Sequence, residues 1–362
     1  SNGYPFASIK LDSVQIEQNK LSAQLYINKN KLYKIDSVLI KGNATISDKY
    51  IENYIKIKEG DIYNEESIRK ISARIKELPF VVEEKQWKVL FTEEKSKVIL
   101  FLKKKQASRF DGVLGVLPNE ETGKLRLTGD VKLNLINSFH NGEKIEFNWR
   151  SIQENTQDLK FNVMYPFLVN SPLGLDYNFK LYKKDTTFID VSNKIGVRYI
   201  LKGNDYFKLF FHNKSSSLLS QAGFATATVL PSYADVSSQL YGIETYNTNL
   251  DYLLNPRKGY QVKISGSLGN KNIKKNPQID DNLYEGLDLK SILYNAKLVA
   301  NYFIPVTKRN ILKLGTKNSY TFNENLFENE LLRIGGLLTL RGFDEESIFA
   351  SFYSIQTLEY RY

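Results

Sequence analysis

From residue 109 onward, apolar and polar residues alternate along the chain with the period of a β-strand that has two different faces. The pattern recurs in segments of about ten residues, which is enough to cross a bilayer as a tilted strand. Clear examples are residues 125–135, 145–150, 159–165, 175–181 and 294–302. This pattern predicts either a soluble sheet with an apolar core or a barrel with lipid outside and water inside.

Aromatic residues favour the barrel. The apolar rows often end in aromatics, where the interfacial girdles of a membrane barrel fall. Examples are Tyr165 with Phe167, Tyr302 with Phe303, and Tyr320 with Phe322.

The lengths of the connections favour the barrel as well. Counted from Phe110, about twelve strands precede the end of the sequence. A barrel whose first strand rises from the periplasm has short turns after even strands and long loops after odd strands, whereas a soluble sandwich predicts no such parity. The connections after even strands are mostly tight, at 137–142, 167–172, 202–204, 248–258 and 305–309, and those after the later odd strands are long, at 215–237, 269–290 and 323–350.

Before residue 108, helical and strand patterns mix within the length of one small domain. The predicted order is strand, helix, helix, strand, strand. Ser47 and Asn64 are N-cap candidates for the two helices. Apolar residues keep helical spacing from Ile68 to Leu78 and stop at Pro79.

This order, with its short motifs, resembles a POTRA domain, the periplasmic module that precedes Omp85-type barrels. The resemblance covers residues 31–105, and it implies that residues 1–30 are the last strands of a preceding POTRA domain. An ordinary α+β domain with no partner is the alternative that this segment alone leaves open. The motif residues are Gly42 and Asn43 after the first strand, Gly60 in the turn between the helices, and Pro79 at the following corner.

A long connection near the C-terminus is unusually rich in Gly, Leu and Ile. Residues 331–343 read LLRIGGLLTLRGF. Such a loop gains little in water unless it packs against something, and folding back into the barrel lumen provides that contact. There Arg341 would be a desolvated cation that needs carboxylate partners, and Gly342 would permit a tight turn. We read the following acidic residues, Asp344 to Glu346, as solvated, with lumen partners as the alternative.

The same stretch resembles the Arg-Gly-Phe motif in the sixth extracellular loop of the Omp85 superfamily. Together with the POTRA match, the resemblance covers nearly the whole chain. The matching residues are Arg341, Gly342 and Phe343, preceded by the pair Gly335 and Gly336. Asn255, Pro256 and Gly259 resemble the family's periplasmic turn before the ninth strand, and residues 137–143 its turn before the third.

The resemblance implies a fold class: an α+β POTRA domain followed by a transmembrane antiparallel β-barrel over residues 109–362. About 12 strands are present and about 16 are expected in the whole protein. We therefore expect the sequence to be incomplete at both ends, with the C-terminal strands and the acidic wall residues that pair with Arg341 in the missing part.

Composition excludes several kinds of chemistry. The chain has no Cys, and its only imidazoles are His140 and His212, which argues against disulfides, thiolate zinc sites and histidine-based catalysis. The formal charge of +10 comes from 50 basic and 40 acidic residues that are interleaved, so we expect no nucleic-acid partner. No nucleotide loop, paired-carboxylate motif or nucleophile elbow is present. We therefore expect no enzyme activity, no cofactor and no metal.

The resemblance implies an outer-membrane protein, with its POTRA domain in the periplasm, that inserts β-barrel proteins into the membrane or passes polypeptides across it. The implied partners are unfolded outer-membrane or secreted polypeptides and outer-membrane lipid, with room for periplasmic or lipoprotein accessory subunits. The first strand, residues 110–117, contains Gly112 and Gly115 and is a candidate for a weakly paired seam. Alternatives are a two-partner secretion exporter, the barrel anchor of a patatin-like lipase, and a barrel with no client.

Overall fold

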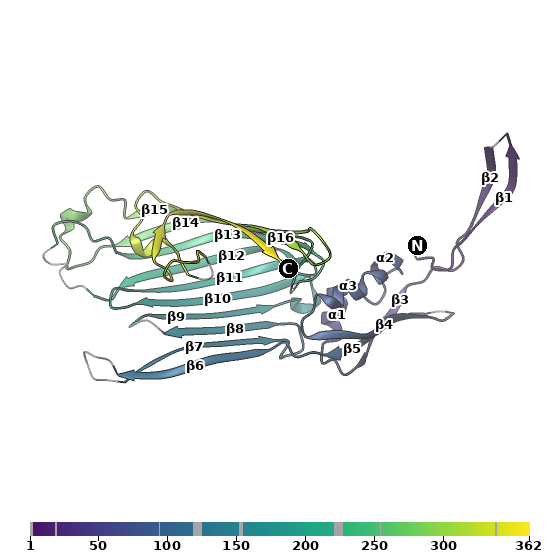
Figure 1. Ribbon diagram of the computed structural model, residues 1–362, viewed down its shortest axis with the longest axis horizontal. Helices are drawn as coiled ribbons and strands as arrows, with labels where there is room; N and C mark the ends of the chain where they lie inside the picture. The colour runs from purple at the N-terminus through teal and green to yellow at the C-terminus, as the bar shows by residue number, and fades with distance from the viewer. Residues whose placement is uncertain are drawn as a thin grey trace. The chain divides into compact units, whose positions relative to one another are not determined.

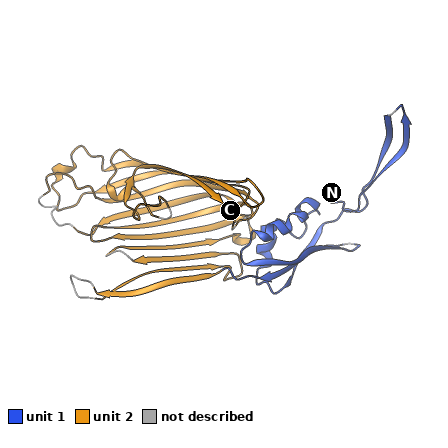
Figure 2. Cartoon of the chain, in the orientation of Figure 1, with its two compact units in different colours: residues 1–107 blue, residues 108–362 orange. Residues whose placement is uncertain are grey.

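The computed structural model describes residues 3–18, 20–93, 95–118, 125–151, 155–220, 227–253, 255–336 and 339–362. The chain divides into two units, Ser1–Ala107 and Ser108–Tyr362 (Figure 2). No helix among the described residues is long and apolar enough to span a membrane.

The first unit contains a three-stranded sheet with helices packed on it. Its strand order is β3-β5-β4, with β3 parallel and β4 antiparallel to β5. Strand bounds are β3 (Ile35–Gly42), β4 (Val81–Phe91) and β5 (Ser96–Lys104), and helix bounds are α1 (Asp48–Ile55), α2 (Glu65–Arg69) and α3 (Ile71–Lys76).

Apolar side chains on one face of the helices and one face of β5 form the core of this unit. Alternate residues of β5 are buried, as period-two patterning requires. The Asn64 side chain accepts a hydrogen bond from the Ser67 backbone N–H at 3.1 Å, which confirms the predicted cap of the second helix. Side chains that are at most 1 % exposed here include Ile51, Ile68, Ile71, Ile75, Val98, Leu100 and Leu102.

A separate hairpin precedes this sheet. It pairs β1 (Ser8–Glu17) with β2 (Lys20–Asn28), and both strands are exposed along nearly their whole length. Its exposed side chains include Ile16 and Leu21, at 74 % and 64 %. The interpretation of residues 1–30 as the end of a preceding domain stays a prediction.

The second unit is built on one antiparallel sheet of twelve strands, in which each strand is bonded to its neighbours in sequence (Figure 1). The sheet curls, and β6 and β19 are its edges in the described part of the chain. The strands are β6 (Arg109–Pro118), β7 (Leu125–Ile136), β8 (Lys144–Ser151), β9 (Gln157–Tyr165), β10 (Leu173–Lys184), β11 (Phe188–Lys202), β12 (Asp205–Leu218), β13 (Asp235–Leu250), β14 (Gly259–Lys274), β15 (Lys290–Pro305), β16 (Ile311–Phe322) and β19 (Phe352–Arg361).

The two faces of this sheet differ as the alternation predicts. On β12, Phe207 and Leu209 are 41 % and 57 % exposed, while Lys208 between them is 5 % exposed. The exposed face is apolar and the other face, here called the inner wall, carries the charged side chains. Other exposed apolar residues on the strands include Phe110, Leu125, Ile195, Val197, Tyr241, Ile264, Leu268, Tyr302 and Leu358.

From β11 onward the connections alternate in length, as predicted for the later strands, whereas residues 185–187 between β10 and β11 form a short turn at the end of the sheet where the long connections lie. The short ones follow β7, β9, β11, β13 and β15 and lie at one end of the sheet. The long ones join β12 to β13, β14 to β15 and β16 to β19, and these strands lead into them at the other end of the sheet. Because antiparallel neighbours alternate direction, this parity places the short turns on one side and the loops on the other.

The core of the first unit predicts the effect of removing one buried methyl-bearing side chain. Ile71 is 1 % exposed, so Ile71→Ala is expected to lower the unfolding free energy of this unit by about 2–5 kcal/mol through lost burial and a residual cavity. Hydrogen exchange of the β5 backbone amides in the full chain measures this free energy. Leu90→Ala is the control because Leu90 is 51 % exposed; equal losses in the two variants would contradict the assigned core.

Candidate functional site

The connection between β16 and β19, residues 323–351, folds against the inner wall of the sheet. It contains the short helix η4 (Glu328–Glu330) and the strands β17 (Leu332–Ile334) and β18 (Ile348–Ala350), which pair as an antiparallel hairpin. This segment is named the inner loop. It brings Gly335 and Gly336 next to the Arg-Gly-Phe residues, since the Gly336 backbone N–H donates to the Phe343 carbonyl at 3.0 Å.

Gly335 is required by a close approach at the end of this hairpin. It has φ of +124°, and a Cβ atom there would lie 2.1 Å from the Asp344 carbonyl oxygen. Its backbone N–H donates to the Thr339 hydroxyl at 2.8 Å. A side chain at this position would therefore force the two arms of the hairpin tip apart.

A buried ion pair fixes the inner loop to the wall. Arg333 on β17 donates to Asp190 on β11 at 3.0 Å, and each side chain is 9 % exposed. The guanidinium also lies over the rings of Tyr182 and Phe188, at 4.1 and 5.1 Å from their centroids. Glu346 adds a second, longer ion pair at 3.9 Å. Since removing one partner of a buried pair leaves an uncompensated charge, this contact holds the loop strongly.

A second buried contact is made by Glu330, shortly before Arg333 in the inner loop. Lys271 on β14 is completely buried and pairs with Glu330 at 2.6 Å. Asn329, also completely buried, donates to the Ser216 hydroxyl at 2.7 Å and to the Ala234 carbonyl at 2.8 Å. These bonds join η4 to β12, to β14 and to the connection before β13.

The three long connections share a small apolar core at this end of the sheet. The buried members come from all three connections and from the ends of β13 and β14. The core therefore ties the inner loop to the other two connections by burial as well as by charge. Its members are Ala234, Val236, Ile273, Ile279, Tyr284 and Phe327, with Leu230, Leu283, Leu287 and Leu289 packed around them.

The inner wall below the loop carries a charge network. Glu244 on β13 lies within ion-pair distance of Lys208, Lys263 and Lys194, at 2.6, 3.2 and 3.6 Å. Asp176 on β10 pairs with Arg198 at 2.6 Å and with Lys208 at 3.2 Å. This part of the inner wall is therefore polar, and each of its two carboxylates is paired with more than one cation.

The comparisons with known proteins agree with this geometry. Residues 33–81 match the POTRA family, described as a surface antigen variable number repeat. Among solved structures, BamA from Haemophilus ducreyi lacking POTRA domains 1–3 is 14 % identical with a TM-score of 0.50, and the match covers 96 % of this chain and 67 % of that one.

Two CdiB structures are similar as well. CdiB from Acinetobacter baumannii is 16 % identical with a TM-score of 0.55, covering 99 % of this chain and 65 % of that one. CdiB from Escherichia coli is 14 % identical with a TM-score of 0.58, covering 99 % and 66 %. The chain thus spans about two thirds of the length of these structures. A search of curated proteins found no significant match.

The chain has the Omp85-type fold. The POTRA match and the similarity of the fold to BamA and CdiB confirm the fold class and the resemblance predicted from the sequence. The expectation of about 16 strands in the whole protein stays a prediction.

In this Omp85-type chain, the motif arginine and the buried arginine are different residues. Arg341 is exposed at the tip of the inner loop, beside a hollow of about 560 Å³ that Val299, Lys317 and Glu359 also line, and it forms no ion pair with a described residue. The predicted desolvation of Arg341 against acidic wall residues stays a prediction, since those residues are expected outside this sequence. The buried arginine of the inner loop is Arg333, eight residues earlier. The functional role of Arg341, Gly342 and Phe343 stays a prediction, and residues 337 and 338 of the quoted stretch lie outside the described residues.

The acidic run after the motif differs in part from its expected solvated state. Asp344 is exposed. Glu345 pairs with Arg150 on β8 at 3.6 Å, and Glu346 with Arg333. Glu345 therefore has a partner on the sheet, and Glu346 has one within the inner loop.

The turn that contains Asn255, Pro256 and Gly259 is organised by a residue that the sequence analysis missed. Asp251 accepts hydrogen bonds from the backbone N–H groups of Arg257 and Lys258 at 2.9 and 3.0 Å. Burial raises the pKa of Asp251, but these hydrogen bonds outweigh it and leave the pKa below its usual value. At Gly259, φ is +108° and a Cβ atom would lie 1.8 Å from the Asn249 carbonyl oxygen. Asn255 is exposed and Pro256 is buried.

The POTRA motif residues occupy structural positions. Gly42 has φ of +109°, and a Cβ atom there would lie 2.2 Å from the Leu102 carbonyl oxygen. The Asn43 side chain accepts a hydrogen bond from the Lys104 backbone N–H at 3.0 Å, so both residues join β3 to β5. Gly60 has φ of +87° in an open turn, and Pro79 lies between α3 and β4.

Other charged side chains on β7 and β8 form local pairs. Asp130 pairs with Lys132 at 2.9 Å and with Arg150 at 3.6 Å, and Glu146 pairs with Lys144 at 2.6 Å. His212 lies on the inner wall, 2.7 Å from the Ser192 hydroxyl. Within the described ranges, no group of three or more His, Cys, Asp or Glu residues is placed to hold a metal ion.

The buried ion pair predicts how the inner loop is released. Asp190→Asn leaves the Arg333 charge without its main partner, at a cost of roughly 3–5 kcal/mol, so the loop is expected to open and trypsin to cleave after Arg333 at least tenfold faster. Time-resolved proteolysis with mass spectrometry measures the cut. Glu345→Gln is the control, because its pair is half-exposed and is worth at most about 1 kcal/mol. Unchanged cleavage in Asp190→Asn would show that the pair does not hold the loop.

Proposed function

We propose that this chain is an outer-membrane protein of the Omp85 type that inserts β-barrel proteins into the membrane or translocates polypeptides across it, with its POTRA domain in the periplasm. The observation that carries the proposal is the inner loop, which lies on the charged wall of a two-faced sheet and is fixed there by the Arg333–Asp190 pair. An outer apolar face suits lipid, and a polar inner wall suits water and a hydrated client.

Client strands are proposed to enter by backbone pairing. The POTRA sheet has β3 and β4 at its edges, and edge strands offer unpaired N–H and C=O groups to an extended peptide with little demand on its sequence. This matches the proposed partners, unfolded outer-membrane or secreted polypeptides. Outer-membrane lipid and accessory subunits are proposed as further partners.

The barrel is proposed to provide a soft seam at β6. In the described sheet β6 pairs with β7 alone, and it contains Gly112 and Gly115, which reduce the side-chain packing that would strengthen its pairing. In lipid a client strand must satisfy its backbone groups as it enters, and an edge of this kind lets it do so. The inner loop would brace the wall while the seam opens.

The alternative function is that of a two-partner secretion exporter, through which one dedicated client passes along the inner wall. The polar, charged wall itself favours it, since a hydrated passage needs such a lining. Cellular depletion separates the two. Loss of many outer-membrane barrel proteins supports insertion, loss of one secreted client supports export, and no change in either overturns both.

Arg341 tests the role of the loop tip. Arg341 is exposed and has no ion pair with a described residue, so Arg341→Ala is expected to change the unfolding free energy by no more than about 0.5 kcal/mol. The proposed function predicts that activity nevertheless falls severalfold, measured as folding of an unfolded barrel client in vesicles that contain the full protein.

Arg309→Ala is the matched control, because Arg309 is an exposed arginine in the short turn between β15 and β16 and does not line the hollow beside Arg341. Loss of fold in Arg341→Ala, or equal losses of activity in the two variants, would contradict a specific role for the loop tip.

A further inference from the structure

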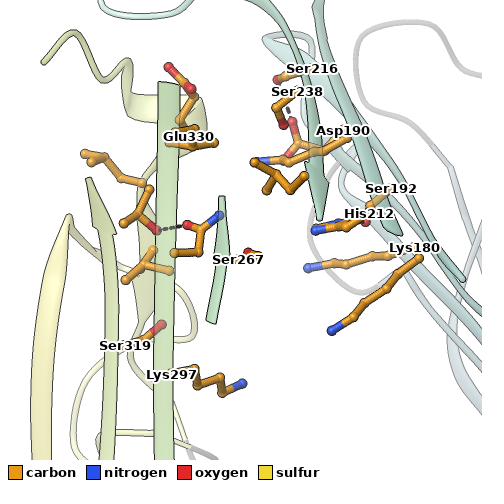
Figure 3. Close-up of a pocket in the computed structure, with 18 of the residues that line it drawn as sticks. Lys180, Asp190, Ser192, His212, Ser216, Ser238, Ser267, Lys297, Ser319 and Glu330 are labelled. Carbon is orange, nitrogen blue, oxygen red and sulfur yellow. Dashed lines mark hydrogen bonds and ion pairs between the residues drawn. The ribbon is translucent and has the colours of Figure 1, made fainter. Parts of the chain in front are cut away.

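A cavity of about 430 Å³ lies on the inner wall beneath the inner loop (Figure 3). It is named the wall cavity. Its lining comes from strands β10 to β16 and from Leu331 to Arg333 of the loop, which closes one side. The volume is that of pockets that hold small ligands. The polar part of the lining consists largely of amino and hydroxyl groups, among them Lys180, Lys297, Ser192, Ser265, Ser267 and Ser319.

The carboxylates of the lining are already engaged. Asp190 pairs with Arg333 at 3.0 Å, and Glu346 pairs with the same arginine at 3.9 Å. Glu330 pairs at 2.6 Å with Lys271, which is not part of the lining. These three groups are therefore committed to holding the inner loop.

The lining lysines have a deficit of anionic partners. Neither Lys180 nor Lys297 forms an ion pair within the part of the chain that the structure describes. Lys194 has Glu244 at 3.6 Å, but that carboxylate also serves Lys208 and Lys263. Figure 3 shows Lys180 and Lys297 on opposite sides of the cavity, with their side chains directed into the space between. Several amines around one hollow produce a positive potential that an anion relieves.

The hydroxyl groups add directional donors to this charge. Ser265 and Ser267 lie on β14, half-buried in the lining between the two lysine-bearing sides. Lysine amines bind phosphate as point charges, and hydroxyls donate to its remaining oxygens. An anion with several oxygens in this cavity can accept hydrogen bonds from amino and hydroxyl groups together.

We propose that the wall cavity binds a compact phosphate-bearing ligand, held between Lys180 and Lys297. The ligand is a free phosphate compound or the headgroup of a phospholipid. The site stands on the cavity alone and does not depend on the proposed handling of polypeptides.

Binding to the full protein in a phosphate-free maltoside detergent tests the site. The probes are inorganic pyrophosphate and dihexanoyl phosphatidic acid, each titrated by calorimetry. Tighter binding of pyrophosphate assigns the site to a free phosphate compound, and tighter binding of the lipid assigns it to a headgroup. Lys180→Gln with Lys297→Gln is expected to weaken the better probe at least about tenfold.

Lys132→Gln is the control matched to each single change. The substitution also removes one positive charge from the inner wall, but Lys132 pairs with Asp130 and lies outside the cavity. Its affinity is expected to equal that of the unaltered chain. Circular dichroism reports the fold, and Lys297→Gln alone, at an exposed position, carries the test where the double variant fails to fold.

Three results would overturn the proposal: no binding of either probe, an equal loss in Lys132→Gln, or binding of a polyglutamate peptide without binding of either phosphate probe. If the chain binds pyrophosphate but does not assemble clients, the anion site is supported and only the proposed function is contradicted.

Discussion

The alternation of apolar and polar side chains along each strand is the constraint on which the second unit depends. Because neighbouring residues of a strand point to opposite faces, each of the twelve strands contributes one apolar row to the outside and one polar row to the inner wall. A shift of one residue in any pairing would exchange the two. The continuous antiparallel pairing from β6 to β19 keeps every row in place, and the charged wall is the result.

The position of the inner loop depends on its contacts with that wall. A segment rich in Leu, Ile and Gly would be poorly placed in water, and here it gains partners of two kinds. Its charged residues, Arg333 and Glu330, meet opposite charges on β11 and β14, and Phe327 enters the small apolar core of the long connections. Charge sets the position of the loop on the wall, and burial keeps it there.

Sequence patterns predicted the architecture well because architecture follows from period. The strands, the parity of the connections and the cap at Asn64 all depend on residues close together in the chain. The buried ion pair was missed because it joins residues 143 positions apart. The residues around Arg333 in the sequence did not identify it, rather than Arg341, as the buried arginine. Arg333 lies on β17, which pairs with β18. Asp251 was missed because the turn motif drew attention to Asn255 and Gly259, while the carboxylate that organises the turn precedes them.

The shared apolar core of the three long connections has a consequence for motion. Phe327 packs in the same cluster as Tyr284 and Ala234, which belong to different connections. The inner loop cannot leave its place by a small hinge at its own ends, since departure exposes side chains that its neighbours also bury. Displacement of the inner loop therefore requires the three long connections to rearrange together, because they share one buried cluster.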